Sequence, residues 1–401
     1  LHPWTSRHRL ITAMTGSLSP IRINGAGPTG SLLAIGLANF GYSIHLYDPL
    51  NVEQICSRSR AYALTHSSRR LLTRLGLWND VLPFLSPFKT LRLEDRGINQ
   101  LVNFTESDLH SSNKSTHTVG WILDHTFLMK LLMSRLEKIT HVKLHLGEVS
   151  DQSLPFHEFG LVIAADGPRS TTRTKFGFPW WSHSYTQGCL TAKVRFRDID
   201  SEKAFECFRP EGPLAILPLG NADFQVVWSA PFDRCRQLAG LQASAFLDRI
   251  STILPHGLEP DALLDTPAAF PLEISFAPKL HRGNVVLVGE SGHRCHPVGG
   301  QGLNLCWRDV DTLLQLMTSA SCVRRGLKAV PARYARLRYF DLLTVGFATD
   351  LLVRLFSNRQ SGLLLVRRLG LLMLKHSSLF RRVSLQAMSD GPSSLLHHSP
   401  E

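Results

Sequence analysis

The sequence predicts an α/β protein in which a nucleotide-binding domain is assembled from separated segments around an inserted, mostly antiparallel sheet. Near its start, an apolar run at 21–24 is followed by glycines, a helical segment at 31–40 and a second apolar run at 43–47. This order is typical of a strand–turn–helix–strand unit. Short alternating segments separated by Pro, Gly and Asp fill 89–119 and 179–275 and indicate antiparallel strands. A helical pattern at 125–138 and a buried strand at 161–165 lie between these two ranges. Segments typical of an α/β domain therefore alternate along the chain with segments typical of an antiparallel sheet.

These patterns divide the 401 residues into two domains, a basic amphipathic helical C-terminal region and two ends expected to be disordered. The content of 43% hydrophobic and 19% charged residues is close to that of globular proteins and excludes wholesale disorder. The ranges are 20–88, 120–178 and 276–340 for the α/β domain, 89–119 and 179–275 for the sheet domain, 341–388 for the C-terminal region, and 1–13 and 389–401 for the ends.

The seven cysteines are scattered and include no Cys-x-x-Cys pair, so neither a disulfide framework nor a zinc site is expected. The first twenty residues contain no continuous apolar stretch typical of a secretory signal. Together these features favour a reducing, cytoplasmic location.

A G-x-G-x-x-G motif, Gly25, Gly27 and Gly30, lies directly between the first strand and the first helix. In this context the first glycine permits a tight turn, the second lets a pyrophosphate approach the backbone, and the third lets the helix pack closely. Asp48 ends the second strand, where an acid can bind ribose hydroxyls. Strand, helix and acid together favour a dinucleotide site over a chance glycine turn.

Two further strands end in glycine and an acid. Asp166 and Gly167 follow the run at 161–165, with Ser170 and Arg173 after them, a pattern that by itself also fits a structural turn. Gly289 and Glu290 follow the run at 285–288 and precede a glycine-rich helix start at 297–304. A carboxylate beside a helix N-terminus suits a ligand with hydroxyls and an anionic group, such as a reduced flavin.

The ordered set of three sites resembles the FAD-dependent aromatic hydroxylases of the para-hydroxybenzoate hydroxylase type, and more closely the ubiquinone-biosynthesis hydroxylase family. The resemblance covers about residues 20–390 and implies a Rossmann-like FAD-binding domain with an inserted substrate domain. It also implies that Arg60, in the run Arg-Ala-Tyr-Ala-Leu at 60–64, contacts FAD. The cofactor-binding residues it implies are Gly25, Gly27, Gly30, Asp48, Arg60, Asp166, Gly167, Gly289, Glu290, Pro297, Gly300, Gly302, Leu303 and Asn304.

The family commonly has Asp-Ala-Ala-His where this chain has Glu290-Ser291-Gly292-His293, so Glu290 adds a methylene to the expected ribityl contact. The resemblance implies that NAD(P)H reduces FAD and that O2 supplies one oxygen atom to an activated phenol ring. The flavin carries the difficult chemistry, and we assign no catalytic side chain. His293 and His296 precede a proline, and a structural or surface role is expected for both rather than a catalytic one.

Between Arg324 and Arg382 thirteen Lys or Arg stand against two acids, which accounts for +11 of the net charge of +12. Leucines and phenylalanines alternate with these arginines, and no stretch of about twenty uninterrupted apolar residues occurs. The pattern favours helices lying at a membrane surface over core helices with a solvated basic face. Nucleic acid is not expected as a partner, since no recognition motif accompanies the charge.

The sequence thus predicts an FAD-dependent monooxygenase that uses NAD(P)H and O2 to hydroxylate a prenylated phenol in quinone biosynthesis, of the ubiquinone or plastoquinone type. We expect it to be peripheral on the inner face of a membrane, with a quinone-biosynthesis enzyme complex as a possible partner. The alternatives are a soluble aromatic hydroxylase of another pathway, an FAD-dependent prenyl reductase on the same scaffold, or a non-catalytic basic binding module.

Overall fold

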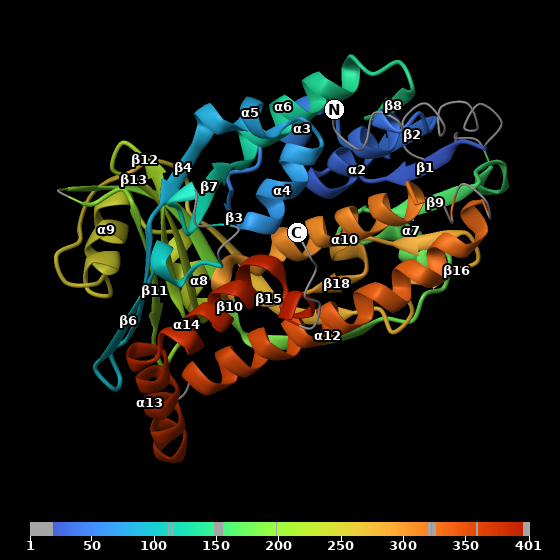
Figure 1. The fold of residues 1–401 in the computed structure, drawn as a ribbon. Coiled ribbons are helices and arrows are strands. Elements are labelled where there is room, and N and C mark those ends of the chain that lie inside the picture. Colours follow the sequence, from blue (N-terminus) through green and yellow to red (C-terminus); the bar gives the residue numbers. More distant parts are fainter. Residues whose placement is uncertain are drawn as a thin grey trace.

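The computed structural model describes residues 19–395 except 111–112, 114–115, 148–154, 198, 320–321, 323–325 and 358–359. It contains a six-stranded sheet at one end of the molecule and a nine-stranded sheet at the other, with long C-terminal helices alongside (Figure 1). This arrangement confirms the predicted fold class.

The six-stranded sheet has the order β16-β17-β9-β1-β2-β8, and all its strands except β16 run parallel. Every residue of β1 and β9 is buried, so these strands are continuous apolar runs rather than alternating ones, as expected for a parallel sheet covered on both faces. Its strands are β1 (Ile21–Asn24), β2 (Ile44–Asp48), β8 (Val142–Leu146), β9 (Leu161–Ala164), β16 (His281–Arg282) and β17 (Val285–Leu287).

Three helices pack together against this sheet, with α2 in contact with both α6 and α10. A Cβ added at Gly36 would lie 2.7 Å from the Leu314 side chain, so the small residue allows α2 and α10 to approach closely. The helices of this part are α2 (Pro28–Asn39), α3 (Val52–Cys56), α4 (His66–Arg74), α5 (Trp78–Val81), α6 (His125–Glu137), α7 (Thr171–Lys175) and α10 (Gln301–Met317).

The nine-stranded sheet has the order β18-β15-β10-β13-β12-β11-β5-β6, with β14 paired to β10. Its ladders are antiparallel apart from the parallel pair β11 and β5. The long strand β10 pairs with β13, β14 and β15, and α8 (Phe232–Ala239) packs beside it, whereas α9 (Ala243–Ser251) packs beside β14. Its strands are β5 (Thr90–Asp95), β6 (Gln100–Thr105), β10 (Trp181–Arg197), β11 (Lys203–Phe208), β12 (Leu214–Gly220), β13 (Asp223–Pro231), β14 (Glu259–Leu263), β15 (Ala268–Phe276) and β18 (His293–Arg294).

A small antiparallel sheet, β3-β7-β4, lies in the segments that the sequence places in the α/β domain. Its strands are β3 (Ala61–Leu64), β4 (Leu85–Phe88) and β7 (Gly120–Asp124). Ala61 and Ala63 of β3 and Ile122 of β7 pack in one apolar cluster with Phe208 of the large sheet, so this sheet joins the two larger ones.

The C-terminal region forms α12 (Val330–Phe356), α13 (Ser361–His376), α14 (Ser378–Asp390) and a short 3-10 helix (Pro392–Leu395). The helix α12 is continuous through residue 340, where the sequence suggests a domain boundary. No helix in the described ranges is long and apolar enough to cross a membrane. Figure 1 shows α13 at the periphery, next to β6.

The expected disorder of residues 389–401 is wrong for 389–395. Ser389 is buried, the Asp390 carboxylate lies 2.6 Å from the Arg70 guanidinium, and the Ser393 N–H donates to Asp341 over 3.0 Å. These tertiary contacts order a segment whose Ser-Pro-rich composition suggested a free tail. The expected disorder of 1–13 and of 396–401 concerns residues outside the described part.

A buried network centred on the Asp309 carboxylate connects α10 with α12 and with the end of β17. Its Oδ1 accepts from Arg338 Nε at 2.6 Å, and its Oδ2 accepts from His293 Nε2 at 2.7 Å and from the Gly289 N–H at 2.8 Å. Arg338 donates in turn to Asp341 at 2.8 Å. Burial by itself would raise the pKa of Asp309, but the charges of His293 and Arg338 and these hydrogen bonds hold it well below its usual range.

We expect Asp309→Asn to lower the free energy of unfolding by about 3–5 kcal/mol, because it removes the charge that compensates the buried Arg338. Because the pKa of Asp309 is lower in the folded protein than in the unfolded chain, its charge stabilises the fold fully at pH values above the unfolded pKa of about 4. This contribution is lost as the pH falls through the folded-state pKa. The difference between wild type and variant, measured by denaturant unfolding, should therefore shrink in acid. Asp311→Asn, at the more exposed Arg74 pair on the same helix, is the control and should cost about 1 kcal/mol or less. Equal losses of unfolding free energy in Asp309→Asn and Asp311→Asn would contradict the assignment of Asp309 as the charge that compensates Arg338.

Candidate active site

The carboxyl ends of four neighbouring parallel strands meet at one edge of the six-stranded sheet. Asp48 ends β2, Gly25 follows β1, Asp166 follows β9, and Gly289 follows β17. Because these strands run in the same direction, the three glycine-bearing motifs, far apart in the sequence, lie at one edge.

Close backbone contacts join the first motif to the other two. Gly25 has a φ of +102°, and a Cβ there would collide with the Ala165 carbonyl, while a Cβ at Gly30 would collide with the Gly25 carbonyl. A Cβ at Gly289 would lie 3.1 Å from the Thr29 side chain. These glycines are thus required by packing within the protein.

Other motif glycines face open space. A Cβ at Gly27, Gly167 or Gly302 would meet no protein atom within 4 Å. Gly27 is the N-cap of α2, where neither a capping side chain nor an acid in the first turn neutralises the N–H groups. The helix α10 likewise begins without a side-chain cap at Gly300, which has a φ of +62°. Two uncapped helix N-termini therefore border this edge, and each favours an anionic group.

The acids of the first two motifs bind the protein backbone. Asp48 accepts from the Ala26 N–H at 2.8 Å and from the Leu50 N–H at 2.9 Å, and so holds the glycine turn against β2. Asp166 accepts from Ser170 Oγ at 2.5 Å and from the Thr172 N–H at 3.0 Å, which fixes the start of α7.

Arg173 links the second motif to the third. It donates to the Ser291 carbonyl and to the Pro168 carbonyl, each at 2.9 Å, and its guanidinium lies 3.7 Å from the centroid of the Trp180 ring. Burial lowers the pKa of Arg173, although the Asp166 carboxylate opposes this shift. Sequence analysis noted this arginine within its motif but not its bridging role.

The third motif forms a half-buried loop with a free carboxylate. The Glu290 side chain is partly buried and accepts no hydrogen bond from the described residues. Its charge nevertheless raises the pKa of Cys295 and of Cys306, after the larger effect of their burial. This carboxylate is therefore available to a ligand, and its contact with a cofactor stays a prediction.

The loop at 297–304 is attached to β3 and α4. Asn304 donates from Nδ2 to the Ala63 carbonyl at 2.7 Å and accepts at Oδ1 from Ser68 Oγ at 2.7 Å. Leu303 packs against the main apolar core, and Pro297 precedes the short 3-10 turn at 298–300. The predicted residues of this segment therefore lie together at the start of α10.

Arg60 is exposed just before β3, with its guanidinium 5.9 Å from the Phe270 ring centroid of β15. It therefore lies where the α/β part meets the large sheet, and both Arg60 and Glu290 act electrostatically on the Tyr62 hydroxyl. The His293 side chain is buried, and its Nε2 forms a hydrogen bond with the Asp309 carboxylate. This contact supports a structural role for His293.

Residues 159–323 match the model of an FAD-binding domain family. The chain is 28% identical over 397 residues to an uncharacterized protein of Synechocystis, covering 94% of each chain. It is 28% identical to the 3-demethoxyubiquinol 3-hydroxylase of Escherichia coli, over 93% of this chain and 99% of that protein. It is 27% identical to a ubiquinone hydroxylase of Rhodospirillum rubrum, over 95% and 93% of the two chains. Among solved structures, p-nitrophenol 4-monooxygenase from Pseudomonas putida superimposes with a TM-score of 0.74 at 16% identity, over 92% and 96% of the chains.

These findings confirm the resemblance to the FAD-dependent aromatic hydroxylases. The chain is an FAD-dependent monooxygenase. The geometry of the monooxygenase fits its cofactor on three independent points: open space above Gly27, two uncapped helix N-termini, and the free Glu290 carboxylate. FAD, when bound, supplies the redox chemistry with O2, whereas the protein binds, orients and excludes water.

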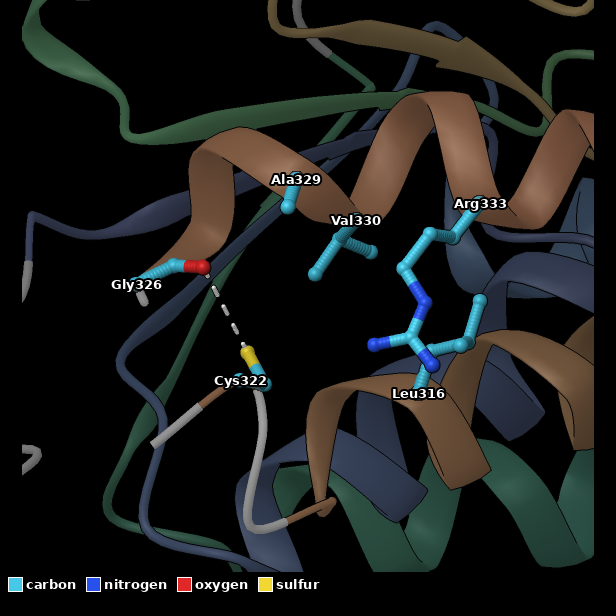
Figure 2. Close-up of a pocket in the computed structure, with 6 residues that line it drawn as sticks. All are labelled: Leu316, Cys322, Gly326, Ala329, Val330 and Arg333. Carbon is cyan, nitrogen blue, oxygen red and sulfur yellow. Dashed lines mark hydrogen bonds between the residues drawn. The ribbon is translucent and has the colours of Figure 1, made fainter. Parts of the chain in front are cut away.

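The pocket of the monooxygenase shown in Figure 2 lies elsewhere. It is lined by Leu316, Cys322, Gly326, Ala329, Val330 and Arg333, between the end of α10 and the start of α12. At 1.5 Å per residue, the 17 residues of α10 place its end about 25 Å from its glycine-rich start. This pocket is therefore separate from the predicted cofactor edge.

Three residues near this edge carry no signal in the motifs of the sequence: Asp309, Arg338 and Glu206. The first two hold the Gly289 loop, as described above. Glu206 is buried on β11, where burial raises its pKa and the nearby Gly299 N–H opposes that shift. The role of each depends on partners that are distant in the sequence. At position 206 a charged residue inside an apolar strand is nevertheless a local signal of a functional or structural role.

We expect Gly27→Leu to abolish FAD retention while leaving the fold intact, because the added side chain enters space that the protein itself leaves open. The flavin absorbance of the purified protein measures retention, and circular dichroism monitors the fold. Gly370→Leu on α13, where an added Cβ also meets no atom, is the matched control and should keep its flavin. Full flavin content in Gly27→Leu would exclude a pyrophosphate at this turn.

Proposed function

We propose that the chain hydroxylates the aromatic ring of a prenylated phenol in ubiquinone- or plastoquinone-type quinone biosynthesis, consuming NAD(P)H and O2. The observation that carries this proposal is the match to the Escherichia coli and Rhodospirillum rubrum hydroxylases over more than nine-tenths of the chain. That match includes the sheet domain and the C-terminal helices. Because one fold serves many ring substrates, the substrate class rests on these relatives rather than on the fold.

In this proposal the predicted site residues divide by the part of FAD that they contact. Gly25, Gly27, Gly30 and Asp48 hold the ADP half at the N-terminus of α2, with the pyrophosphate above Gly27. A second set, from the second and third motifs and from Arg60, holds the ribityl chain and the flavin ring. The members of this second set are Arg60, Asp166, Gly167, Gly289, Glu290, Pro297, Gly300, Gly302, Leu303 and Asn304.

The N–H groups at the start of α10 would face the flavin ring and stabilise negative charge on it after reduction. The large sheet covers the other side of the substrate and limits access of water. Since the sequence contains one strand–G-x-G-x-x-G–helix unit, NAD(P)H would bind transiently rather than in a second domain of its own.

We further propose that α12, α13 and α14 bind the inner face of a membrane, where a prenylated substrate resides and where a quinone-biosynthesis enzyme complex could assemble. Leu337, Phe340, Leu343, Phe347 and Leu351 are 47–69% exposed and recur every three or four residues, so they form one apolar stripe on α12. Exposed basic residues accompany these helices and suit anionic headgroups. They are Arg336, Arg354, Arg368, Lys375 and Arg382. Further exposed apolar residues are Leu365, Val366, Leu369 and Met373 on α13 and Leu379, Phe380 and Val383 on α14.

We expect Phe347→Glu combined with Leu365→Glu to weaken binding to phosphatidylglycerol-containing vesicles at least tenfold. Withdrawing one exposed apolar side chain from lipid costs about 1.5–3 kcal/mol, and 1.4 kcal/mol is a factor of ten. Vesicle flotation measures the bound fraction. Leu82→Glu combined with Leu264→Glu, exposed apolar residues away from these helices, is the control and should bind as wild type does. Equal binding by all three proteins would exclude this surface.

The function itself is tested by the quinone and precursor profile of cells that lack the gene, measured by mass spectrometry. We expect a prenylated phenol one oxygen atom short of the next intermediate to accumulate, and complementation to remove it. An unchanged profile in cells without a redundant hydroxylase would instead favour a hydroxylase of another pathway. Accumulation of a less saturated prenyl chain would favour a prenyl reductase.

A further inference from the structure

Glu206 is a buried carboxyl group that faces the flavin-side loop from the large sheet. On β11, Ala204 and Phe208 pack in one apolar cluster with Val298 of that loop, whereas Phe205 and Cys207 pack in another cluster on the opposite face. Since side chains alternate along a strand, Glu206 points to the same side as Ala204 and Phe208. It is 8% exposed.

Among the described residues, the backbone N–H of Gly299 is the group beside this carboxyl group that opposes the effect of burial on its pKa. Burial raises the pKa of Glu206 to about 7, and the contact with Gly299 only partly opposes this shift. A buried carboxylate normally accepts several hydrogen bonds, so Glu206 retains unused acceptor capacity next to the loop.

His296 offers the complementary group on the loop itself. Its Nδ1 accepts from the Val298 N–H at 3.2 Å, which assigns the ring hydrogen to Nε2. That Nε2 is buried and has no hydrogen-bond partner among the described residues. Burial lowers the pKa of His296 to about 3, so the ring is neutral at physiological pH and Nε2 is a donor. An unsatisfied buried donor costs about 1–3 kcal/mol, which a ligand could recover.

We propose that Glu206 and His296 form the subsite for the ring hydroxyl of the phenolic substrate, with His296 Nε2–H donating to the hydroxyl oxygen and Glu206 accepting the hydroxyl hydrogen. This inference rests on the proposed function. A phenol hydroxyl both donates and accepts one hydrogen bond here, and the two buried groups flanking residues 297–299 supply one acceptor and one donor.

The proton balance of the step is simple. The phenol O–H bond breaks as an O–H bond forms on Glu206, and the electron pair remains on the ring oxygen. The resulting electron density on the ring favours its attack on an oxygen atom delivered from the flavin side. Glu206 thus acts as the general base, and a pKa near 7 suits this task.

Other titratable groups on this side of the sheet are engaged elsewhere. The Tyr185 hydroxyl, whose ring lies 5.4 Å from that of His296, donates to Asp350 at 2.7 Å, and Asp350 also pairs with Arg354. Asp95, beside Phe208 on β5, pairs with Arg367. Glu206 is therefore a buried carboxyl group in this part of the described structure whose pKa lies near neutral.

The test uses the FAD-loaded full chain with a phenol that carries a ten-carbon prenyl tail, and with its methyl ether. The variant Glu206→Gln keeps an oxygen for the Gly299 N–H but cannot take a proton. We expect unchanged flavin content, a fall in product formation of about 10²–10⁴-fold, and loss of the decline that wild-type kcat shows below about pH 7. The methyl ether should not be oxygenated by wild type, and His296→Phe should raise the dissociation constant of the phenol about tenfold.

Glu94→Gln is the matched control, because Glu94 is on the neighbouring strand β5 and its partners are Arg92 and Arg96. It should keep wild-type activity and pH dependence. If Glu206→Gln retains both, or wild type oxygenates the methyl ether as well as the phenol, the subsite is wrong while the hydroxylase function stands. A flavin-loaded wild-type protein that oxygenates no phenol would overturn the proposed function and this subsite together.

Discussion

The fold depends on one buried carboxylate, Asp309, which satisfies three donors from three different parts of the chain. It binds Gly289 at the end of β17, His293 on β18 and Arg338 on α12. A charge in the interior is tolerated only when it is paired and fully hydrogen-bonded, so each of these groups must be in place for the others to be stable. The loop after β17, the edge of the large sheet and the C-terminal helix are thereby held in one arrangement.

This constraint matters because the predicted cofactor edge is made of loops. Loops have no regular backbone hydrogen bonds, as strands do, to fix their positions. Parallel strands bring the loops to one edge, but their mutual placement comes from contacts such as Arg173 on the Ser291 carbonyl and Asn304 on the Ala63 carbonyl. The glycines then serve two purposes. Gly25 and Gly30 permit the protein to pack against itself, whereas Gly27 borders space that no protein atom fills.

The basic C-terminal region also has two parts with different roles. Arg338 and Arg367 are buried in ion pairs with Asp309 and Asp95 and so hold α12 and α13 to the rest of the molecule. Arg381 pairs with Asp108 and does the same for α14. The surface charge is therefore smaller than the sequence count indicates, and what remains accompanies exposed leucine and phenylalanine side chains.

The sequence by itself determined the fold class and the three glycine-bearing motifs, because strand periodicity and the steric demands of glycine are local properties. It also supplied the family resemblance. It did not determine that residues 389–395 are ordered, since Asp390 and Ser393 are held by partners at Arg70 and Asp341. Nor could it reveal the Asp309 network or the position of Glu206. A carboxylate becomes a buried structural charge or a candidate base only through the groups around it, and those groups come from distant segments that the tertiary structure brings together.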